Sequence, residues 1–426
     1  MTIEELYSVY LQAERVSTDT RTIAKGDLFF ALKGGHFNGN RFAEQAVKDG
    51  AWAAVVDEKE FENPEKGIFW FENTLFALQN LARHHRRKLT IPVVSLTGSN
   101  GKTTSKELIT SVLKQKFNVL STQGNLNNHI GVPLTVLSIK PQHEIAVIEM
   151  GANHQKEIEL LSGIAQPNIG YITNFGKAHL EGFGGEEGVI KGKSELYAYL
   201  REYGQTALVN RDDAKQVELT HDIQTISFGT TSGMYQFALS EGENNRVSFR
   251  YGNVLIHSQL TGNYNFANLC AASALGLHFG LTIEQIKQGI ESYYPQNQRS
   301  QIVKKEGKTL VLDTYNANPS SMEASLRNFA DFQGSKAVIL GDMFELGEES
   351  PAEHQKIADL AQNLHFNFIY LLGERFYQTK IQADNVMKFR TTDEMNDYLQ
   401  THKIQTDNIL LKGSRGMALE KLFESV

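Results

Sequence analysis

The sequence is poor in cysteine, long apolar runs and excess positive charge, and each shortage excludes a class of protein. The single cysteine, Cys270, cannot form an internal disulfide or a cysteine metal cage, so a cytoplasmic location is expected. No apolar stretch approaches the ~18–20 residues that span a bilayer, and the first residues lack the pattern of a signal peptide. With 42 Lys and Arg against 49 Asp and Glu, the net charge of −7 argues against nucleic acid as a partner.

The composition is that of a globular protein, with 41% hydrophobic and 21% charged residues. A length of 426 residues suggests three domains, at about 150 residues each. Residues 1–89 predict a first α/β domain, with strands at 28–32 and 53–56 and helices at 41–49 and 74–88. The last helix ends in a basic run, 84–88. We interpret this run as cations suited to a helix C-terminus before a linker, rather than as a phosphate site.

Residues 90–296 predict a central domain in which strands and helices alternate. Its strands end at Leu96, Met150 and Thr173, and this alternation is typical of a parallel sheet. Residues 206–260 predict an attached antiparallel sheet, because two alternating runs flank the hairpin signal Gly252-Asn253. Helices are expected from 265 to 292, and residues 294–297 are interpreted as a second linker.

Residues 297–426 predict a third, Rossmann-like domain. Its expected strands are 309–313, 337–340, 368–372 and 408–411. The dinucleotide fingerprint G-x-G-x-x-G is absent after the first of these strands. The fold class is therefore α/β in three domains: a small first domain, a central P-loop-type domain with a mostly parallel sheet and an attached antiparallel sheet, and a Rossmann-like domain.

The segment 97–104, T-G-S-N-G-K-T-T, carries the sharpest chemical signal. It lies between an apolar strand and an amphipathic helix, where backbone N–H groups of a glycine loop can wrap a phosphate chain. Lys102 would neutralise the β and γ phosphates of ATP, and the Thr103 hydroxyl would face Mg²⁺. The general pattern has glycine where this chain has Leu96, so the match is to a variant. The expected phosphate contacts are Gly98, Ser99, Asn100, Gly101, Lys102, Thr103 and Thr104.

Two further residues at strand ends are candidate metal ligands. Glu149 ends the strand at 145–148, and in a parallel sheet ligands gather at the carboxyl ends of the strands. A carboxylate there can hold Mg²⁺ beside the Thr103 hydroxyl. His179 follows the next strand and is expected near Glu149, where it would serve a second metal site.

Several segments together resemble the Mur ligase family of peptidoglycan synthesis. They are the P-loop variant, G-N-L-N-N at 124–128, E-M-G at 149–151, the run 173–181, G-N-Y-N-F-A-N at 262–268 with Ala271-Ala272, 313–319, 340–347 and K-G-S-R-G at 412–416. The resemblance runs in order from Asp19 to Arg415. The last three segments are similar to those of the member that adds D-alanyl-D-alanine.

The resemblance implies an ATP-dependent, ADP-forming ligase. Such an enzyme joins D-alanyl-D-alanine to UDP-N-acetylmuramoyl-tripeptide through an acyl phosphate, in cell-wall synthesis, and thus serves cell shape and division. We expect it to act as a monomer. The alternatives are another Mur-type amino-acid ligase, a folylpolyglutamate synthase-like ligase, or a binding module that has lost turnover. The D-N-P-R segment common in the ligase for the third residue is absent at 315–319.

The resemblance also implies residue roles. Lys193 matches a lysine that CO₂ carbamylates so that it can help to bind a second Mg²⁺, although Ser194 replaces the usual glycine and Lys191 lies nearby. The implied catalytic residues are Lys102, Lys193 and His179, and the implied metal ligands are Thr103, Glu149, His179 and carbamylated Lys193. Further ATP contacts are expected at Asn265, Asn268, Arg299 and Asp313. The nucleotide-sugar substrate is expected at Asp19, Thr20, Arg21, Asn127 and Asn128, with Lys33 and Asn38 as weaker candidates.

Overall fold

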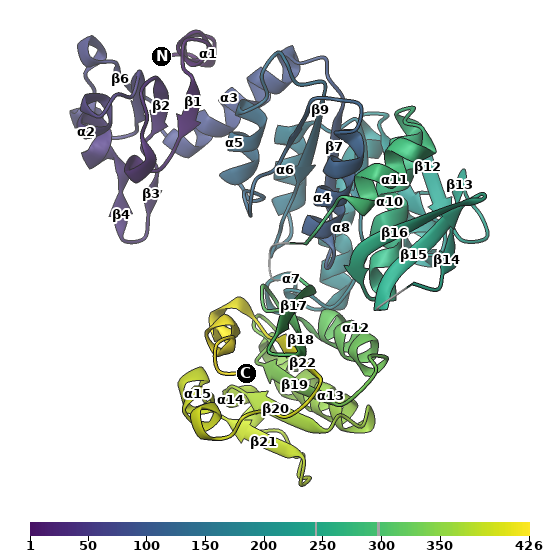
Figure 1. The fold of residues 1–426 in the computed structure, drawn as a ribbon. Helices are drawn as coiled ribbons and strands as arrows, with labels where there is room; N and C mark the ends of the chain where they lie inside the picture. The colour runs from purple at the N-terminus through teal and green to yellow at the C-terminus, as the bar shows by residue number, and fades with distance from the viewer. Residues whose placement is uncertain (243–244, 296–298) are drawn as a thin grey trace.

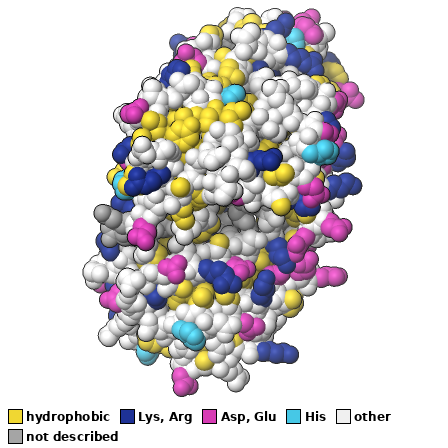
Figure 2. All heavy atoms as spheres, turned by 90° about the vertical axis from the view of Figure 1, so that its right-hand side faces the viewer, with side chains coloured by type: hydrophobic (Ala, Val, Ile, Leu, Met, Phe, Trp, Pro, Cys, Tyr) yellow, Lys and Arg dark blue, Asp and Glu magenta, His cyan; other side chains and the backbone are white. Residues whose placement is uncertain are grey.

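The computed structural model describes residues 1–242, 245–295 and 299–426. Figure 1 shows three α/β units that follow one another along the chain. The expected linker at 294–297 falls partly outside the described residues. Within the described ranges, no helix is long and apolar enough to cross a membrane. On the face seen in Figure 2, basic and acidic side chains are interspersed, and no basic stripe is visible.

The first unit is built on a four-stranded parallel sheet of order β1-β2-β5-β6. Its strands are β1 (Arg15–Ser17), β2 (Asp27–Phe30), β5 (Ala53–Val56) and β6 (Ile68–Trp70), its helices are α1 (Ile3–Tyr10), α2 (Ala43–Lys48) and α3 (Thr74–Lys88), and a small hairpin joins β3 (Lys33–Gly34) to β4 (Phe37–Asn38). The sequence predicted α3 and β5 with the observed bounds. It missed β1 and β6, which have only three residues each and too little alternation to detect.

The central unit contains seven parallel strands in the order β13-β12-β11-β10-β7-β9-β8. The strands are β7 (Val93–Thr97), β8 (Val119–Ser121), β9 (Ile145–Glu149), β10 (Ile169–Ile172), β11 (Thr206–Asn210), β12 (Gln224–Gly229) and β13 (Tyr235–Gln236). Val94 and Val147 face one apolar core, whereas Val93 and Ala146 face the other. Because both faces of the sheet are buried, central strands such as β9 and β10 are nearly continuous apolar runs.

Helices cover both faces of this central sheet (Figure 1). One face packs against α4 (Lys102–Leu113), α10 (Phe266–His278) and α11 (Ile283–Glu291), and the other against α5 (Gly131–Leu137), α6 (Glu157–Ala165) and α8 (Glu186–Glu202). Two short helices complete the unit, α7 (Leu180–Phe183) and α9 (Ala214–Leu219). The helices expected from 265 to 292 are thus confirmed as α10 and α11.

The prediction of an antiparallel sheet over the whole of 206–260 is wrong for its first half. β11, β12 and β13 extend the parallel sheet, and α9 supplies the crossover that β11 and β12 need as parallel neighbours. Only β14 (Ala238–Ser240), β15 (Arg246–Tyr251) and β16 (Val254–Thr261) form the antiparallel sheet. The expected hairpin is confirmed: Tyr251 pairs with Val254, and Gly252 at the turn has a φ of 55°.

The third unit has a six-stranded sheet of order β17-β18-β22-β19-β20-β21. Its strands are β17 (Gln301–Lys305), β18 (Lys308–Asp313), β19 (Lys336–Gly341), β20 (Phe368–Leu372), β21 (Val386–Phe389) and β22 (Asn408–Lys412), and its helices are α12 (Pro319–Ala330), α13 (Ser350–Asn363), α14 (Glu374–Tyr377) and α15 (Thr392–Thr401). All strands are parallel except β17, which pairs antiparallel with β18. The four predicted strands are present.

The basic end of α3 is not a simple set of surface cations. His85 and Arg86 are buried. The Arg86 guanidinium donates to the carbonyls of Ala165 and Gln166, at 3.0 Å each, and to the side chain of Asn168 at 2.9 Å. Arg86 therefore provides hydrogen-bond donors for the free carbonyl groups at the C-terminus of α6, and it connects the first unit to the central one. The periodicity of α3 did not reveal this, because the contact depends on a segment 80 residues away.

We expect Arg86→Ala to destabilise the protein by about 3 kcal/mol, since several buried carbonyl groups would lose their donor. The neighbouring Arg87 is exposed, so Arg87→Ala serves as the control and should change stability by less than about 0.5 kcal/mol. Thermal unfolding of both variants measures the difference. Equal melting temperatures would contradict the docking role of Arg86.

Candidate active site

A cavity of about 960 Å³ lies between the central and third units. The carboxyl ends of β7, β9 and β10 open into it, as does the end of β18. Its lining includes most of the residues that the sequence analysis selected: Ser99, Asn100, Gly101, Lys102, Thr103, Thr104, Asn127, Asn128, Glu149, His179, Asn265, Asn268, Arg299 and Asp313. The parallel topology explains this convergence, because the carboxyl ends of parallel strands share one edge.

The glycines of the P-loop are required by space and by backbone conformation. Gly98 has a φ of 140°, and a Cβ there would lie 2.0 Å from the Thr173 hydroxyl. Gly101 has a φ of 78° and faces the Asn268 amide in the same way. Lys102 opens α4, and its Nζ donates to the Gly98 carbonyl at 2.7 Å. Burial lowers the pKa of Lys102 to about 8.

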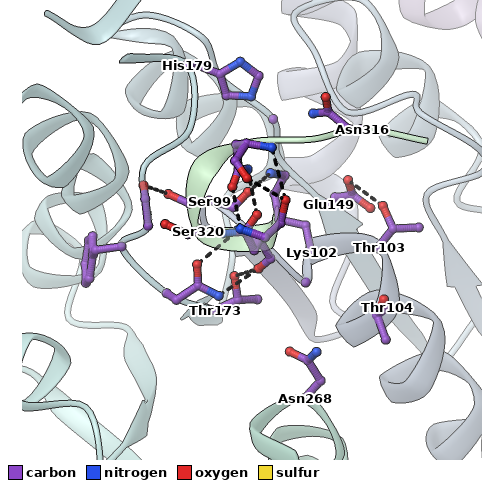
Figure 3. A pocket seen from close by; sticks show the side chains of 18 of the residues that line it. Ser99, Lys102, Thr103, Thr104, Glu149, Thr173, His179, Asn268, Asn316 and Ser320 are labelled. Carbon is purple, nitrogen blue, oxygen red and sulfur yellow. Dashed lines mark hydrogen bonds between the residues drawn. The ribbon is translucent and has the colours of Figure 1, made fainter. Parts of the chain in front are cut away.

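The segment 173–176 holds the P-loop in shape through several hydrogen bonds (Figure 3). The Asn174 carbonyl accepts from the Ser99 N–H at 3.1 Å, and its side-chain oxygen accepts from the Asn100 N–H at 3.0 Å. The Thr173 hydroxyl and the Asn174 amide both donate to the Asn100 carbonyl. Thr173 and Asn174 thus have a supporting role that the sequence did not assign to them individually.

Only one of the two carboxylate oxygens of Glu149 accepts hydrogen bonds from the described residues. Its Oε1 accepts from the Thr103 hydroxyl at 3.2 Å and from the Asn127 amide at 2.8 Å. Its Oε2 is buried and has no hydrogen-bond partner among the described residues. Carboxylate and hydroxyl oxygens suit Mg²⁺, so Thr103 and Glu149 fit a divalent cation. The amide of Asn127, which was expected to contact substrate, thus also orients Glu149.

His179 lines the same cavity, but its ring contacts Glu345 rather than Glu149. In Figure 3 it lies at the edge of the cavity, apart from the Glu149–Thr103 pair. Within the described ranges, no group of three or more His, Cys, Asp or Glu side chains could by itself hold a metal. Sequence reasoning missed Glu345 as an individual residue, although it lies in the segment 340–347 that carried the resemblance.

Lys193 is completely buried on α8. Its Nζ donates to the Ala152 carbonyl at 3.0 Å and lies 4.9 Å from the centre of the Phe183 ring. Burial, with a smaller contribution from Lys102, holds the pKa of Lys193 well below its usual value. Ala152 lines the cavity, whereas Lys193 does not, and Lys191 is exposed. The buried lysine therefore lies behind Ala152 of the cavity wall, and its burial favours the neutral amine.

The residues expected at the nucleotide have partners of their own. The Asn268 amide accepts from Ser105 and donates to Asn265, at 2.9 Å each. Arg299 stacks on Tyr315, with 3.8 Å between the guanidinium carbon and the ring centre. The Arg299 Nε is buried without a hydrogen-bond partner in the described chain.

Asp313, the last of the residues expected at the nucleotide, pairs with the buried Lys412 at 2.5 Å. Lys412 ends β22, the strand adjacent to β18, so the ion pair connects the two strand ends. The ion pair fixes the Asp313 carboxylate at the cavity edge.

The three substrate candidates of the first unit lie outside this cavity. Asp19 and Arg21 form an ion pair of 2.7 Å, which lowers the pKa of Asp19 to about 2. Thr20 lies between them in a short 3-10 helix. Asn128, which does line the cavity, uses its side-chain oxygen to accept from the Ile130 and Gly131 N–H groups at the start of α5.

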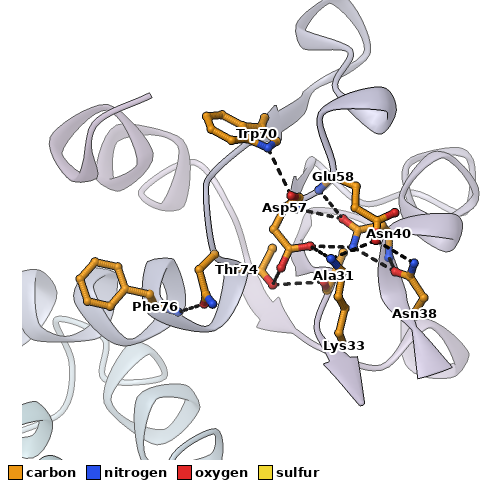
Figure 4. A network of polar contacts seen from close by, with 10 residues as sticks. Ala31, Lys33, Asn38, Asn40, Asp57, Glu58, Trp70, Thr74 and Phe76 are labelled. Carbon is orange, nitrogen blue, oxygen red and sulfur yellow. Dashed lines mark hydrogen bonds and ion pairs between the residues drawn. The ribbon is translucent and has the colours of Figure 1, made fainter. Parts of the chain in front are cut away.

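A separate polar network in the first unit contains the two weaker candidates (Figure 4). Lys33 pairs with Asp57 and Glu58, at 2.9 Å each, and Asn38 donates to Glu58 at 3.0 Å. The buried Asn40 donates to Asp57 at 2.8 Å. The network fixes the β3–β4 hairpin against the end of β5.

Comparison with known proteins identifies relatives along the whole chain. Three domain families match: the catalytic domain of the Mur ligase family at 12–95, the Mur ligase middle domain at 96–276, and the Mur ligase glutamate ligase domain at 298–415. Two curated relatives are named UDP-N-acetylmuramoyl-tripeptide–D-alanyl-D-alanine ligase. The one from Bacillus subtilis is 33% identical and covers 96% of this chain and 92% of its own; the one from Escherichia coli is 34% identical and covers 99% and 95%.

Solved structures agree with these relatives. MurF from Acinetobacter baumannii superposes with a TM-score of 0.88 at 32% identity, over 99% of this chain and 98% of its own. MurF ligase from Thermotoga maritima, solved in complex with ADP, gives a TM-score of 0.85 at 28% identity, over 98% and 97%. The three-domain α/β fold predicted from the sequence is thereby confirmed.

We expect Lys102→Ala to keep the fold and to lower turnover at saturating ATP by at least about 100-fold, since the loop would lose its cation for the phosphates. In the unchanged chain, ATP affinity should fall as the pH rises through about 8, because Lys102 is charged below that pH and neutral above it. Calorimetric titrations with ATP between pH 6.5 and 9.5 measure this dependence.

The Lys102→Ala variant is also the control for the pH series. Its ATP affinity should be lower throughout and should not fall as the pH rises through about 8. Near-normal turnover in this variant would contradict the phosphate role. An identical pH profile in both proteins would show that another group causes the change.

Proposed function

The chain belongs to the Mur ligase family, and from this we propose how its cavity joins D-alanyl-D-alanine to UDP-N-acetylmuramoyl-tripeptide. The activity is that of an ATP-dependent, ADP-forming ligase of peptidoglycan synthesis. The observation that carries this conclusion is identity of about one third with such ligases over nearly the full length of both chains. The P-loop, Glu149 and the third unit around one cavity are the parts that this chemistry needs.

The reaction has two steps. An oxygen of the terminal carboxylate of the tripeptide attacks the γ-phosphorus of ATP, the bond to the bridging oxygen breaks, and ADP leaves. The neutral amine of D-alanyl-D-alanine then attacks the acyl carbon. Inorganic phosphate leaves with the former carboxylate oxygen, the amine loses its proton, and an amide remains. Lys102 and the P-loop N–H groups offset the charge on the transferred phosphoryl group.

We assign a Mg²⁺ to Thr103 and Glu149, and a second cation to His179 together with carbamylated Lys193. The unpartnered Oε2 of Glu149 supports the first assignment. Bound Mg²⁺ supplies positive charge that offsets the charge on the phosphate oxygens.

The burial of Lys193 supports the second assignment, because a neutral amine is the form that attacks CO₂. The new N–C bond forms as the amine releases a proton, and the side chain becomes an anionic carbamate.

The remaining assignments divide the substrates among the three units. We propose domain limits at 1–89, 90–296 and 297–426, with ATP in the central unit and the dipeptide at the third. The nucleotide-sugar substrate would contact Asp19, Thr20 and Arg21 of the first unit and Asn127 and Asn128 of the central unit. Arg21 supports this division because its guanidinium is exposed and lies on a different unit from the P-loop. Asn268 would contact the adenine of ATP, Asp313 its ribose and Arg299 its phosphates, and Asn265 would be a further ATP contact. We further propose that the chain acts as a monomer in the cytoplasm.

The test is product formation across a panel of substrates. UDP-N-acetylmuramoyl peptides of two, three and five residues are combined with D-alanyl-D-alanine, single amino acids or glutamate, and ADP and the coupled product are measured by mass spectrometry. We expect coupling only for the tripeptide with the dipeptide. Coupling of a single amino acid would favour another ligase of the family, and ADP release without coupling in every pair would contradict the ligase function.

We expect Lys193→Ala to be nearly inactive, because a carbamate could no longer form. Acetate should restore part of its activity by supplying a carboxylate in that space. The matched control is Lys191→Ala, which should stay largely active, since Lys191 is exposed and two residues along α8 turn it about 200° away.

Activity with and without about 100 mM acetate measures this rescue. Full activity of Lys193→Ala would contradict the carbamate. An inactive Lys191→Ala beside an active Lys193→Ala would place the modification two residues earlier.

A further inference from the structure

His179 and Glu345 come from different units of the chain and share an uncommon backbone conformation. His179 has a φ of 56° and Glu345 a φ of 60°, both in the left-handed region that side chains other than glycine seldom adopt. The Glu345 carboxylate contacts Nδ1 of His179, and the Glu345 carbonyl accepts from the Glu181 N–H at 3.2 Å. Strained residues that meet in this way are common at functional sites, because the surrounding structure must compensate for their cost.

We propose that Glu345 is a positioning residue that aims His179 at the cavity. The proposal rests on the function assigned above, in which His179 is a metal ligand. An imidazole has two nitrogens, and the hydrogen bond that one makes decides which lone pair the other offers. Here Nδ1 faces the Glu345 carboxylate, so Nδ1 carries the proton and Nε2 offers its lone pair. Nε2 has no hydrogen-bond partner in the part of the chain that the structure describes.

This arrangement has the form of a carboxylate behind a metal-binding histidine. Such carboxylates fix the tautomer and the ring orientation, and their loss usually weakens metal binding by about 10- to 100-fold. Glu345 is half-exposed and belongs to the third unit, whereas His179 belongs to the central unit. The carboxylate can therefore act only while the third unit is docked on the central one.

Other contacts also hold the third unit against the central one. Lys177 reaches across to the third unit, where its Nζ pairs with Glu353 at 2.8 Å and its N–H donates to the Ser320 hydroxyl at 2.9 Å. Asn318 donates to the Asn100 side chain in the P-loop at 2.7 Å. Lys177→Met thus weakens docking without touching His179, and it separates a docking effect from an orienting effect.

The experiment has two readouts and five variants. ¹⁵N-histidine NMR at about pH 8.5, where histidines are generally neutral, reports the tautomer of His179, whose signal is assigned by its loss in His179→Gln. Titration with Mn²⁺ in the presence of a non-hydrolysable ATP analogue reports metal affinity by electron paramagnetic resonance. The test variants are Glu345→Ala, Glu345→Gln and Lys177→Met. The control is Glu348→Gln, which changes an exposed glutamate in the same turn.

We expect the unchanged chain to hold His179 with the proton on Nδ1. In Glu345→Ala, His179 should populate both tautomers, and the affinity for the second Mn²⁺ should fall by about 10-fold or more. Glu345→Gln, which keeps an acceptor, should recover part of both, and Glu348→Gln should match the unchanged chain. Lys177→Met should shift the tautomer less than Glu345→Ala does.

The contrary outcomes are separable. If His179→Gln weakens the second Mn²⁺ but Glu345→Ala leaves tautomer and affinity unchanged, the positioning role is wrong and the metal assignment stands. If Lys177→Met and Glu345→Ala change both readouts equally, Glu345 is a docking contact and not a positioning residue. If His179→Gln itself leaves Mn²⁺ binding unchanged, the metal assignment of the proposed function fails.

Discussion

The hydrogen bonds between the P-loop and the segment 173–176 are the constraint on which the rest of the site depends. Gly98 and Gly101 give the loop its shape, but Thr173 and Asn174 hold it there by closing on Ser99 and Asn100. The same segment continues into Lys177 and His179, which contact the third unit. One stretch of seven residues, 173–179, therefore joins phosphate binding to domain docking.

Electrostatics gives the site its chemical character. A charged group buried without a partner is costly, yet the chain buries Lys193 completely and leaves Glu149 Oε2 without a hydrogen bond. Burial holds the pKa of the lysine well below its usual value, and this favours the neutral amine that the proposed carbamylation needs. The carboxylate oxygen would meet the cost of burial by binding a cation. The two groups that lack a charged partner in the described part of the chain, Lys193 and Glu149, are thus the ones to which CO₂ and a cation are assigned.

The features that depend on a local sequence pattern could be predicted. The P-loop, Glu149, α3 and the strands of the third unit could be predicted because periodicity and glycine spacing are local signals. Long-range partners could not be predicted. The hydrogen bond from Asn127 to Glu149 was not expected, and neither was the burial of Arg86, which was interpreted only as one of the cations suited to a helix C-terminus. β11 and β12 were assigned to the wrong sheet because the hairpin at Gly252 was extended too far back along the chain.

The central claim is that the cavity transfers the γ-phosphoryl group of ATP to the carboxylate of the nucleotide-sugar tripeptide. The most direct measurement follows the carboxylate oxygen. UDP-N-acetylmuramoyl-tripeptide labelled with ¹⁸O in its terminal carboxylate is turned over with ATP and D-alanyl-D-alanine, and the released phosphate is analysed by mass spectrometry. The account predicts one ¹⁸O in each phosphate, because the acyl phosphate leaves with a carboxylate oxygen. Unlabelled phosphate alongside coupled product would contradict it.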